Sequence, residues 1–311
     1  MPKSIRDAYG EALVKYGKDD PRVVVLDADV SASTKTSMFA KACPERFFNV
    51  GIAEADMTAM GAGFAATGKI PFINTFAVFL SSIGLIASRT FASYSKLPMK
   101  LAGAYGGLSA CYEGSSHHSL EDVAIMRSLA NVKVFVASDA TNADWLVKNA
   151  IDDPSPIYLR MSRETFDDIY SPNEKFEAGK GKIVRNGKDA TVIACGLMVG
   201  NALKAAKLLE AEGIDLRVVD MFCIKPIDKD LIVRCAKETG AIVTAEEHNV
   251  FGGLGSAVSE VLCSSGIGLP FSILGIEDVH AESGPYAALQ EKYGLDAKSV
   301  AARVKEVLKK K

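Results

Sequence analysis

A carboxylate and two aromatic side chains in the segment 49–80 have types and a spacing that can do chemistry. Glu54 precedes a stretch of small residues, and Phe76 and Phe79 stand three positions apart after a short apolar run. Aromatic rings beside a carboxyl group in an apolar environment can form a slot for a flat heterocycle. Two plainer interpretations stay open: Glu54 is a favourable charge in a helical first turn, and both phenylalanines are core residues.

The elements that position these residues are predicted to be those of an α/β fold. Helical periodicity covers residues 5–16 and 53–67. Short continuous apolar runs predict strands that are covered on both faces, as in a parallel sheet, at 23–26, 47–50, 72–75, 100–102, 134–137 and 157–160. Open α/β sheets bind ligands at the carboxyl ends of their strands. We therefore expect Glu54 and Phe76 to meet at such an edge, to which the preceding strand delivers Gly51 and Ile52.

The character of the chain changes between Tyr170 and Asp189, where Pro, Asn, Gly and Lys replace the apolar periodicity. We predict a linker there, running into an edge strand of the next domain. A second α/β unit follows, with predicted strands at 191–195, 216–220, 241–245 and 271–275 and an amphipathic helix at 201–212. The predicted fold is two consecutive α/β domains, 1–170 and 190–311, joined by a linker at 171–189, each with a mostly parallel sheet flanked by helices.

Composition excludes several classes of protein. The 311 residues carry a net charge of -2 and are 48% hydrophobic, which is typical of a soluble globular protein and not of a nucleic-acid or membrane-surface binder. Polar residues interrupt the apolar stretch 70–88, so we expect no membrane span there, and the first ten residues lack the apolar core of a signal peptide. The four histidines lack zinc-ligand spacing. No CxxC pair occurs, so we expect buried, reduced thiols in a cytoplasmic protein, at Cys43, Cys111, Cys195, Cys223, Cys235 and Cys263.

The segments VGIAEADM, at 50–57, and TFAVF, at 75–79, resemble the pyrimidine-binding domain of transketolases and related thiamine-diphosphate enzymes. The resemblance implies that Glu54 bonds to a nitrogen of the cofactor's aminopyrimidine ring and shares the proton that switches the cofactor on. It also implies that Phe79 stacks on that ring, and that Phe76 and Ile52 line the same slot. Under the resemblance, Glu54 is a catalytic and cofactor-binding residue.

Three further residues fall where the family holds the phosphate end of its sugar substrates. The segment from Ser4 is similar to the opening of the same domain and contains Arg6 and Ser33, and the segment LRMSRE contains Arg163. Two arginines and a hydroxyl would make a bidentate phosphate clamp. The alternatives are that Arg6 is an exposed charge on the first helix and that Ser33 is a loop hydroxyl.

The segment GAYGGLSACYEGSSHH, at 103–118, is similar to the family's substrate loop, with departures. The resemblance implies that His117 contacts the donor sugar as a second catalytic residue and that Glu113 bonds the substrate hydroxyls. Tyr105 stands where many transketolases carry another substrate histidine, which leaves the identity of the sugar open. The alternative for His117 is a loop histidine bonded to the backbone.

The segment AEEHNVFGGLGSAVSEVL, at 245–262, is similar to the final domain of transketolases, deoxyxylulose-phosphate synthases and 2-oxoacid dehydrogenase beta chains. Its glycines at 252, 253 and 255 are compatible with an anion-binding helix start. Because the family uses this domain chiefly for assembly, we favour a structural turn with close helix packing.

The sequence contains no GDG segment and no other cluster suited to Mg2+ and a diphosphate. The resemblance therefore implies a split enzyme, in which an N-terminal subunit holds the diphosphate and Mg2+ and the pair assembles as α2β2. The implied reaction is transfer of a two-carbon ketol group between sugar phosphates, with thiamine diphosphate as cofactor. Two alternatives stay open: the beta chain of a 2-oxoacid dehydrogenase, which would not need a phosphate clamp, and a non-catalytic assembly subunit.

Overall fold

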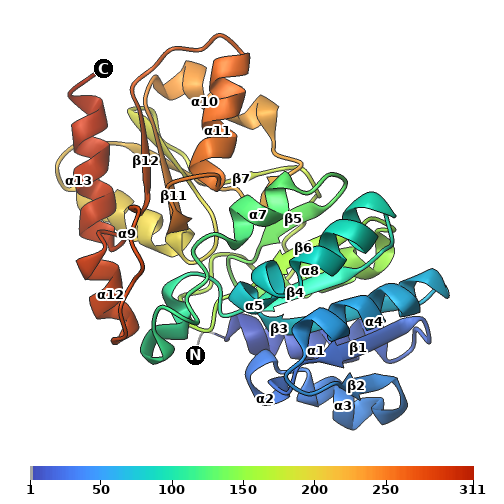
Figure 1. Ribbon diagram of the computed structural model, residues 1–311. Helices are drawn as coiled ribbons and strands as arrows, with labels where there is room; N and C mark the ends of the chain where they lie inside the picture. The colour runs from blue at the N-terminus through green and yellow to red at the C-terminus, as the bar shows by residue number, and fades with distance from the viewer. Residues whose placement is uncertain (1–2) are drawn as a thin grey trace.

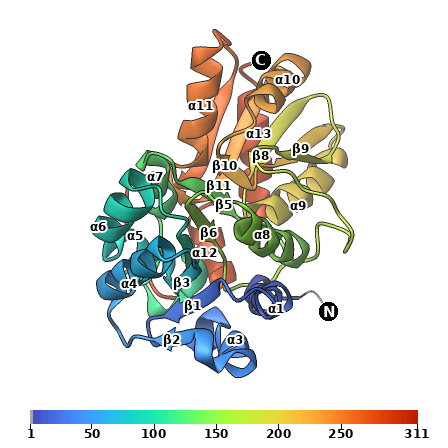
Figure 2. The same cartoon turned by 90° about the vertical axis from the view of Figure 1, so that its right-hand side faces the viewer.

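The computed structural model describes residues 3–311, and in them two mostly parallel sheets are each covered by helices on both faces (Figure 1). The predicted fold class, two α/β domains in succession, is confirmed. The first sheet lies in the blue-to-green half of the chain and the second in the yellow-to-red half. The rotated view shows the two sheets side by side with helices between and around them (Figure 2).

The first sheet has seven strands in the order β10-β5-β6-β4-β3-β1-β2. Its strands are β1 (Val23–Asp27), β2 (Phe47–Asn49), β3 (Ile70–Phe76), β4 (Lys100–Ala104), β5 (Lys133–Val136), β6 (Ile157–Arg160) and β10 (Cys223–Lys225). The helices of this half are α1 (Ile5–Gly17), α2 (Ser31–Thr34), α3 (Ser37–Ala42), η1 (Pro44–Arg46), α4 (Glu54–Ala66), α5 (Ala77–Ser82), α6 (Leu85–Ala87), the π-helix η2 (Ser88–Tyr94), η3 (Leu108–Glu113), α7 (Asp122–Ser128) and α8 (Ala140–Asp152).

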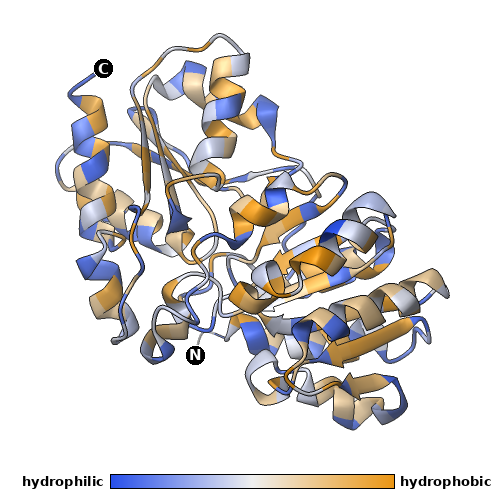
Figure 3. Ribbon diagram, in the orientation of Figure 1, coloured by the Kyte–Doolittle hydropathy of each residue, from blue (hydrophilic) through white to orange (hydrophobic). Residues whose placement is uncertain are grey.

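Alternation along the strands divides the core of the first domain into two layers. In β1, Val24 and Leu26 pack with α4 and α7, whereas Val23 and Val25 pack with α1 and α8. Successive side chains of a strand point to opposite faces, so a run of apolar residues covered on both sides is required. The strands are accordingly orange in the hydropathy view, while most surface helices are two-toned (Figure 3).

The second sheet has five strands in the order β12-β11-β8-β9-β7, with β7 antiparallel to β9 and the other pairs parallel. Its strands are β7 (Lys182–Arg185), β8 (Ala190–Ala194), β9 (Leu216–Asp220), β11 (Ile242–Asn249) and β12 (Phe271–Ile276). The helices of this half are α9 (Met198–Glu210), α10 (Lys229–Thr239), α11 (Leu254–Ser264), α12 (Tyr286–Lys292) and α13 (Ala297–Leu308). β7 lies inside the predicted linker and is an edge strand of this sheet.

The two domains are joined by more than their linker. Residues Cys223–Lys225, which the sequence prediction assigned to the second domain, form β10 and pair antiparallel with β5 at the edge of the first sheet. One apolar cluster also runs from Leu26 and Ile73 in the first domain to Ile193 and Val258 in the second. The domains therefore share buried surface, and a side chain of one can fix the position of a loop of the other.

Several local predictions differ from the structure in detail. The helix predicted at 201–212 begins earlier, at Met198. Five of the six cysteines are buried as predicted, but Cys263 is exposed, because it lies on the outer side of α11. Within residues 3–311, no helix is long and apolar enough to cross a membrane.

Candidate functional site

Glu54 begins helix α4 at the carboxyl end of the first sheet. The chain leaves β2 through Gly51, whose φ of +77° favours glycine, and α4 starts three residues later. The Glu54 side chain is buried, with 6% of its surface exposed. It accepts a hydrogen bond from Thr75 Oγ1, at the end of β3, over 3.5 Å. A carboxylate in this first turn also faces backbone N–H groups that have no partner within the helix.

An aromatic wall lies beside this carboxylate, where β3 runs into α5. The rings of Phe76 and Phe79 are stacked with centroids 5.9 Å apart. The ring of Tyr105, just after β4, lies 4.3 Å from that of Phe76. Phe76 and Tyr105 are buried, whereas Phe79 is half-buried, so part of the wall reaches the surface at Phe79. The prediction that Phe76 and Phe79 lie together is met by this geometry.

His117 reaches the aromatic wall from a long loop. Its ring lies 5.2 Å from Phe79, edge-on, and 5.9 Å from Phe76. Its Nδ1 is 2.9 Å from Ser116 Oγ, so the polar partner of this ring nitrogen is a side chain and not the backbone. The ring is therefore placed at the open side of the wall.

The two predicted arginines both lie close to the ring of Tyr105. Arg6 Nη1 donates to the backbone oxygen of Ser33 over 2.7 Å and to the Tyr105 hydroxyl over 3.2 Å. The guanidinium carbons of Arg6 and Arg163 lie 5.0 and 5.3 Å from the Tyr105 ring centroid. Arg163 Nη1 donates to both carboxylate oxygens of Glu113, over 3.0 and 3.3 Å. Two cations and one carboxylate thus surround a single ring, and the φ of Tyr105, +60°, shows that its backbone is held in an uncommon conformation.

The structure brings most of the predicted site residues together, but not all of them. It brings together Phe76, Phe79, Arg6, Glu113, His117 and Arg163 around Tyr105, with Glu54 bonded to the adjacent strand end. Ser33 contacts Arg6 through its carbonyl oxygen, so its hydroxyl is not what joins the pair. Ile52, predicted to line the slot, is 83% exposed.

A buried polar network next to this site was not predicted from the sequence. Arg160, at the end of β6, donates through Nε to Asp122 Oδ2 over 2.8 Å, and both side chains are buried. Glu247, at the end of β11, is also buried, and burial raises the pKa of its carboxyl to about 7. The only sequence signal was the pair of acidic residues in AEEH, which lies far along the chain in a domain assigned to assembly.

The glycine-rich segment after β11 has a structural role, as favoured from the sequence. Glu246 accepts the backbone N–H groups of Leu254 (2.6 Å) and Gly255 (2.7 Å) at the start of α11. A Cβ on Gly253 would collide with the same carboxylate. The free N–H groups of this helix are thus satisfied by the chain's own side chain, which leaves no place there for an external anion. Over residues 3–311, no group of three or more His, Cys, Asp or Glu side chains is arranged to hold a metal ion.

Comparison with known proteins gives a family for this geometry. Residues 1–167 match the model of the transketolase pyrimidine-binding domain, and residues 179–300 match that of the transketolase C-terminal domain. The chain is 42% identical to a putative transketolase C-terminal section from Methanocaldococcus jannaschii, over 99% of the chain and 97% of that relative. It is 37% identical to a 6-deoxy-6-sulfo-D-fructose transketolase subunit from Clostridium sp., over 99% and 95%.

A full-length relative and a solved structure indicate the same family. The chain is 36% identical to human transketolase over 98% of its own length, but it spans only 49% of that protein. A solved structure described as a split-gene transketolase, an inactive beta4 tetramer, superposes with a TM-score of 0.92 at 50% identity and covers 99% of both chains. The resemblance drawn from VGIAEADM and TFAVF is confirmed: the chain belongs to the transketolase family, in which it corresponds to the C-terminal section of the split members.

Proposed function

We propose that this chain is one subunit of a transketolase that transfers a two-carbon ketol group between sugar phosphates. The observation that carries the proposal is the buried Glu54 carboxylate, placed next to an aromatic wall whose far side meets two arginines. A proton partner, a surface for a flat ring and an anion clamp are thus arranged in sequence along one edge of the sheet. Relatives over nearly the whole chain are named as transketolase subunits or sections, which supports the same reaction class.

The residues present fit the pyrimidine end of thiamine diphosphate. Among residues 3–311 the Glu54 carboxylate has one hydrogen-bond partner, the Thr75 hydroxyl at 3.5 Å, so it has capacity to bond a ring nitrogen. Phe79 would stack on that ring, with Phe76 behind it, and Ile52 would line the outer side. When bound, the cofactor supplies a nucleophilic carbon and an electron sink for carbon–carbon cleavage. Glu54 then holds the proton that the bound ring shares, as a general acid–base group.

The substrate end of the site is proposed to read a phosphate and hydroxyl groups. Arg6 and Arg163 both lie close to the Tyr105 ring and would clamp the phosphate, with Ser33 next to Arg6. Glu113 and His117 would bond the sugar hydroxyls near the reacting carbon. Because Glu113 is bonded to Arg163 in this structure, the clamp and the hydroxyl contacts are electrostatically coupled.

The partner is proposed to be a separate N-terminal subunit that brings the diphosphate and Mg2+ site, in an α2β2 assembly. The sequence lacks GDG, and several relatives are themselves named as sections or subunits. The surface formed by α4, α5 and α6 offers a place for such a partner. Large apolar side chains are exposed on these helices, at Met60 (37% exposed) and Ile86 (76%), and directly next to them in the chain, at Ile52 (83%) and Ile83 (50%). Exposed apolar residues gathered in this way mark interaction sites.

The experiment is reconstitution. The chain is assayed alone and with an N-terminal transketolase subunit encoded beside it, each with thiamine diphosphate and Mg2+, using a ketose phosphate donor and an aldose phosphate acceptor. We expect ketol transfer only from the mixture. Full activity of the chain alone would refute the split site, and 2-oxoacid decarboxylation without ketol transfer by the mixture would refute the reaction.

A further inference from the structure

The loop that carries Glu113 and His117 is closed at its base by the backbone. We name it the 107–119 loop. Gly107 N–H donates to Ser119 O over 3.0 Å, and Ser119 N–H donates back to Gly107 O over 3.2 Å. These two bonds fix where the loop leaves and rejoins the first domain. The eleven residues between them need further contacts to hold their position.

The second domain provides that support through the end of β11. Leu108 N–H, the first amide after the base, donates to Glu247 Oε1 over 3.3 Å. Asn249 N–H donates to Leu120 O over 2.7 Å, just after the other side of the base. Both ends of the loop are therefore bonded to one strand end, more than 120 residues away along the chain.

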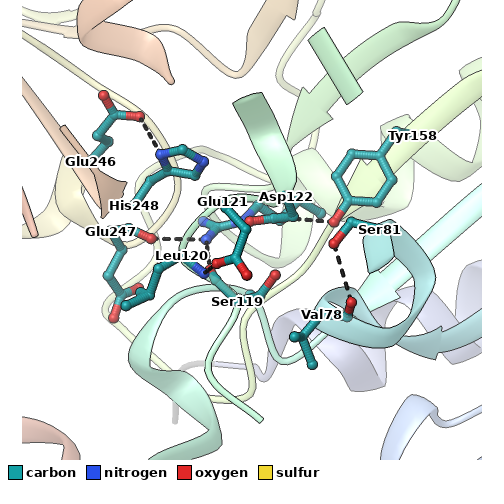
Figure 4. A network of polar contacts seen from close by, with 12 residues as sticks. Val78, Ser81, Ser119, Leu120, Glu121, Asp122, Tyr158, Glu246, Glu247 and His248 are labelled. Atoms are coloured by element: carbon teal, nitrogen blue, oxygen red, sulfur yellow. Dashed lines mark hydrogen bonds and ion pairs between the residues drawn. The ribbon is translucent and has the colours of Figure 1, made fainter. Parts of the chain in front are cut away.

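A buried cation ties the same parts together. Arg160 Nη2 donates to Ser119 O over 3.0 Å and to the backbone oxygen of Glu247 over 2.8 Å. Its Nε is paired with Asp122, which also accepts the Tyr158 hydroxyl over 2.6 Å. Figure 4 shows Glu247, Ser119 and Asp122 converging on this network from three different elements. Arg160 thus bonds the base of the loop to β11 and, through Asp122, to α7, although Ser119 Oγ and Asp122 Oδ1 have no hydrogen-bond partner among residues 3–311.

The tip of the loop is also held by the second domain. Ser115 Oγ donates to Ala281 O, and Gly284 N–H donates to Cys111 O over 3.4 Å. These partners belong to the segment between β12 and α12. Base and tip are both anchored on the domain that does not carry Glu54, so the second domain decides where Glu113 and His117 stand relative to the aromatic wall.

Glu247 brings a charged side chain of the second domain directly to the loop. Its carboxylate is 3% exposed. Gly107 has φ +68°, and a Cβ built there would lie 2.8 Å from Glu247 Cδ, so a glycine is needed for this close approach. Glu246, the preceding residue, is equally buried but bonds the start of α11 instead. The two neighbouring glutamates therefore have separate tasks.

We propose that Glu247 is a positioning residue for ketol transfer: by accepting the Leu108 N–H across the domain interface, it sets the 107–119 loop so that Glu113 and His117 meet the donor sugar. The inference rests on the proposed function for its kinetic part. It assigns a direct role in the active site to the domain that the sequence alone associates with assembly.

The titration of Glu247 adds a second, independent signature. Burial raises the pKa of this carboxyl to about 7, against the opposing effects of Arg160 on β6, Tyr286 on α12 and the Leu108 N–H, while Glu164 after β6 raises it further. Cys111 on η3 faces the same cluster through Tyr286. An ionised carboxylate is the stronger acceptor. The loop is therefore expected to be held more tightly as pH rises through about 7.

The first experiment measures the loop without any assay of activity. Hydrogen–deuterium exchange of the peptide spanning 107–119 is followed in the full chain for Glu247→Ala, Glu247→Gln and the control Glu246→Gln. We expect about tenfold faster exchange in Glu247→Ala, near-parental exchange in Glu247→Gln, whose amide oxygen still accepts the Leu108 N–H, and no change in Glu246→Gln. Equal exchange in Glu247→Ala and the parent chain, or equal acceleration by Glu246→Gln, would overturn the proposal.

The second experiment uses the assembly with the N-terminal subunit. For Glu247→Ala we expect the KM for the ketose donor to rise about tenfold while kcat changes less than about threefold, because the proton-sharing carboxylate Glu54 is untouched. Glu247→Gln should restore the KM and lose its dependence on pH around 7. A fall in kcat alone, or no rescue by glutamine, would refute positioning. If neither the parent nor any variant transfers ketol groups, the proposed reaction is wrong. The hydrogen–deuterium exchange result still decides whether Glu247 positions the loop.

Discussion

The aromatic wall and the 107–119 loop form one site but are built in opposite ways. The wall and its carboxylate depend mainly on Glu54, Phe76 and Phe79, which lie within 26 positions of one another: at the start of α4, at the end of β3 and on α5. The loop supplies Glu113 and His117, and Glu247, which supports it, is 139 positions from the amide that it bonds. The cofactor side of the site is thus fixed locally, and the substrate side is fixed by the docking of a second domain.

This difference indicates which parts of the site can change in sequence while the cofactor residues keep their arrangement. A change in the second domain can move the 107–119 loop while the wall stays in place, because the second domain bonds both the base and the tip of the loop. Relatives with different sugars in their names, a sulfofructose and an apulose phosphate, share this fold over nearly the whole chain. We infer that substrate choice in this family can change through the loop and its frame, apart from the cofactor residues.

The largest effect is expected where the wall is broken. Glu54→Gln keeps the shape of the side chain but removes the carboxylate that shares a proton with the cofactor. We expect ketol transfer by the assembled enzyme to fall on the order of 10²- to 10⁴-fold. Thermal unfolding of the chain should be nearly unchanged, since the glutamine can still accept from Thr75. The measurement is kcat at saturating substrates.

The matched control is Glu45→Gln, an exposed carboxylate just before β2. Its kcat should equal that of the parent enzyme. Retention of more than about a tenth of the activity in Glu54→Gln would remove this residue from its proposed role, and a loss of similar size in the control would point to a general effect of charge.

The next effect tests the frame of the loop through the free energy of unfolding. Burial alone would raise the pKa of Asp122, but the Arg160 guanidinium, His248 and the Tyr158 hydroxyl together hold that pKa below its ordinary value. Asp122→Asn leaves a buried cation without its carboxylate, which costs about 3–5 kcal/mol. Urea unfolding measures the loss. Asp152→Asn breaks the exposed pair with Lys148 and should cost less than about 1 kcal/mol; equal costs for the two variants would contradict a buried frame.

The wall and most of the fold could be predicted because their signals are local. The runs at 23–26 and 72–75 became β1 and β3, and the small-residue helix predicted at 53–67 became α4. Glu54, Phe76 and Phe79 lie at the ends of these elements, so a short sequence motif captures their arrangement. Arg6 and Arg163 were also predicted from local motifs, but the sequence did not predict that both lie next to Tyr105.

The frame of the loop and the domain contact could not be predicted for the opposite reason. β10 has three residues and exists only because β5 offers it an unpaired edge. Glu247 and Arg160 look like an ordinary strand-end acid and base, and only the docked domains place them around the base of the 107–119 loop. A single sequence carries no record of such distant pairings, since neither residue has a periodicity or motif that refers to the other.

The dependence on pH distinguishes Glu247, in the frame of the loop, from another buried acid, Asp220. Burial raises the pKa of Asp220, at the end of β9, to about 7, and the Tyr170 hydroxyl donates to it over 2.7 Å. Because the folded chain keeps this proton between about pH 4 and pH 7 while the unfolded chain releases it, stability falls as pH rises through that window. Above about 7 both states are ionised and the effect ends.

Asp220→Asn should remove this slope, so the free energy of unfolding of the variant relative to the parent should rise by at most about 4 kcal/mol from pH 4 to pH 8. Glu247→Gln should remove a similar fall of stability with pH, because burial raises the pKa of Glu247 to about 7 as well. The KM of the donor, in contrast, should lose its pH dependence around 7 only in Glu247→Gln. A change of KM profile in Asp220→Asn would show that the two buried acids are not distinct in function.

The smallest effect concerns Arg163, which bridges the two regions: it stacks near Tyr105 at the wall and bonds Glu113 on the loop. Arg163→Met keeps the length of the stem but removes the charge, so the KM for a phosphorylated donor should rise about tenfold, while that for the unphosphorylated sugar stays the same. Glu113→Gln frees Arg163 from its partner and should weaken the phosphorylated and unphosphorylated donors equally, because a hydroxyl contact is lost from both. If Arg163→Met impairs both donors equally, the cation serves to hold Glu113 and the loop, and the phosphate must be read by Arg6 alone.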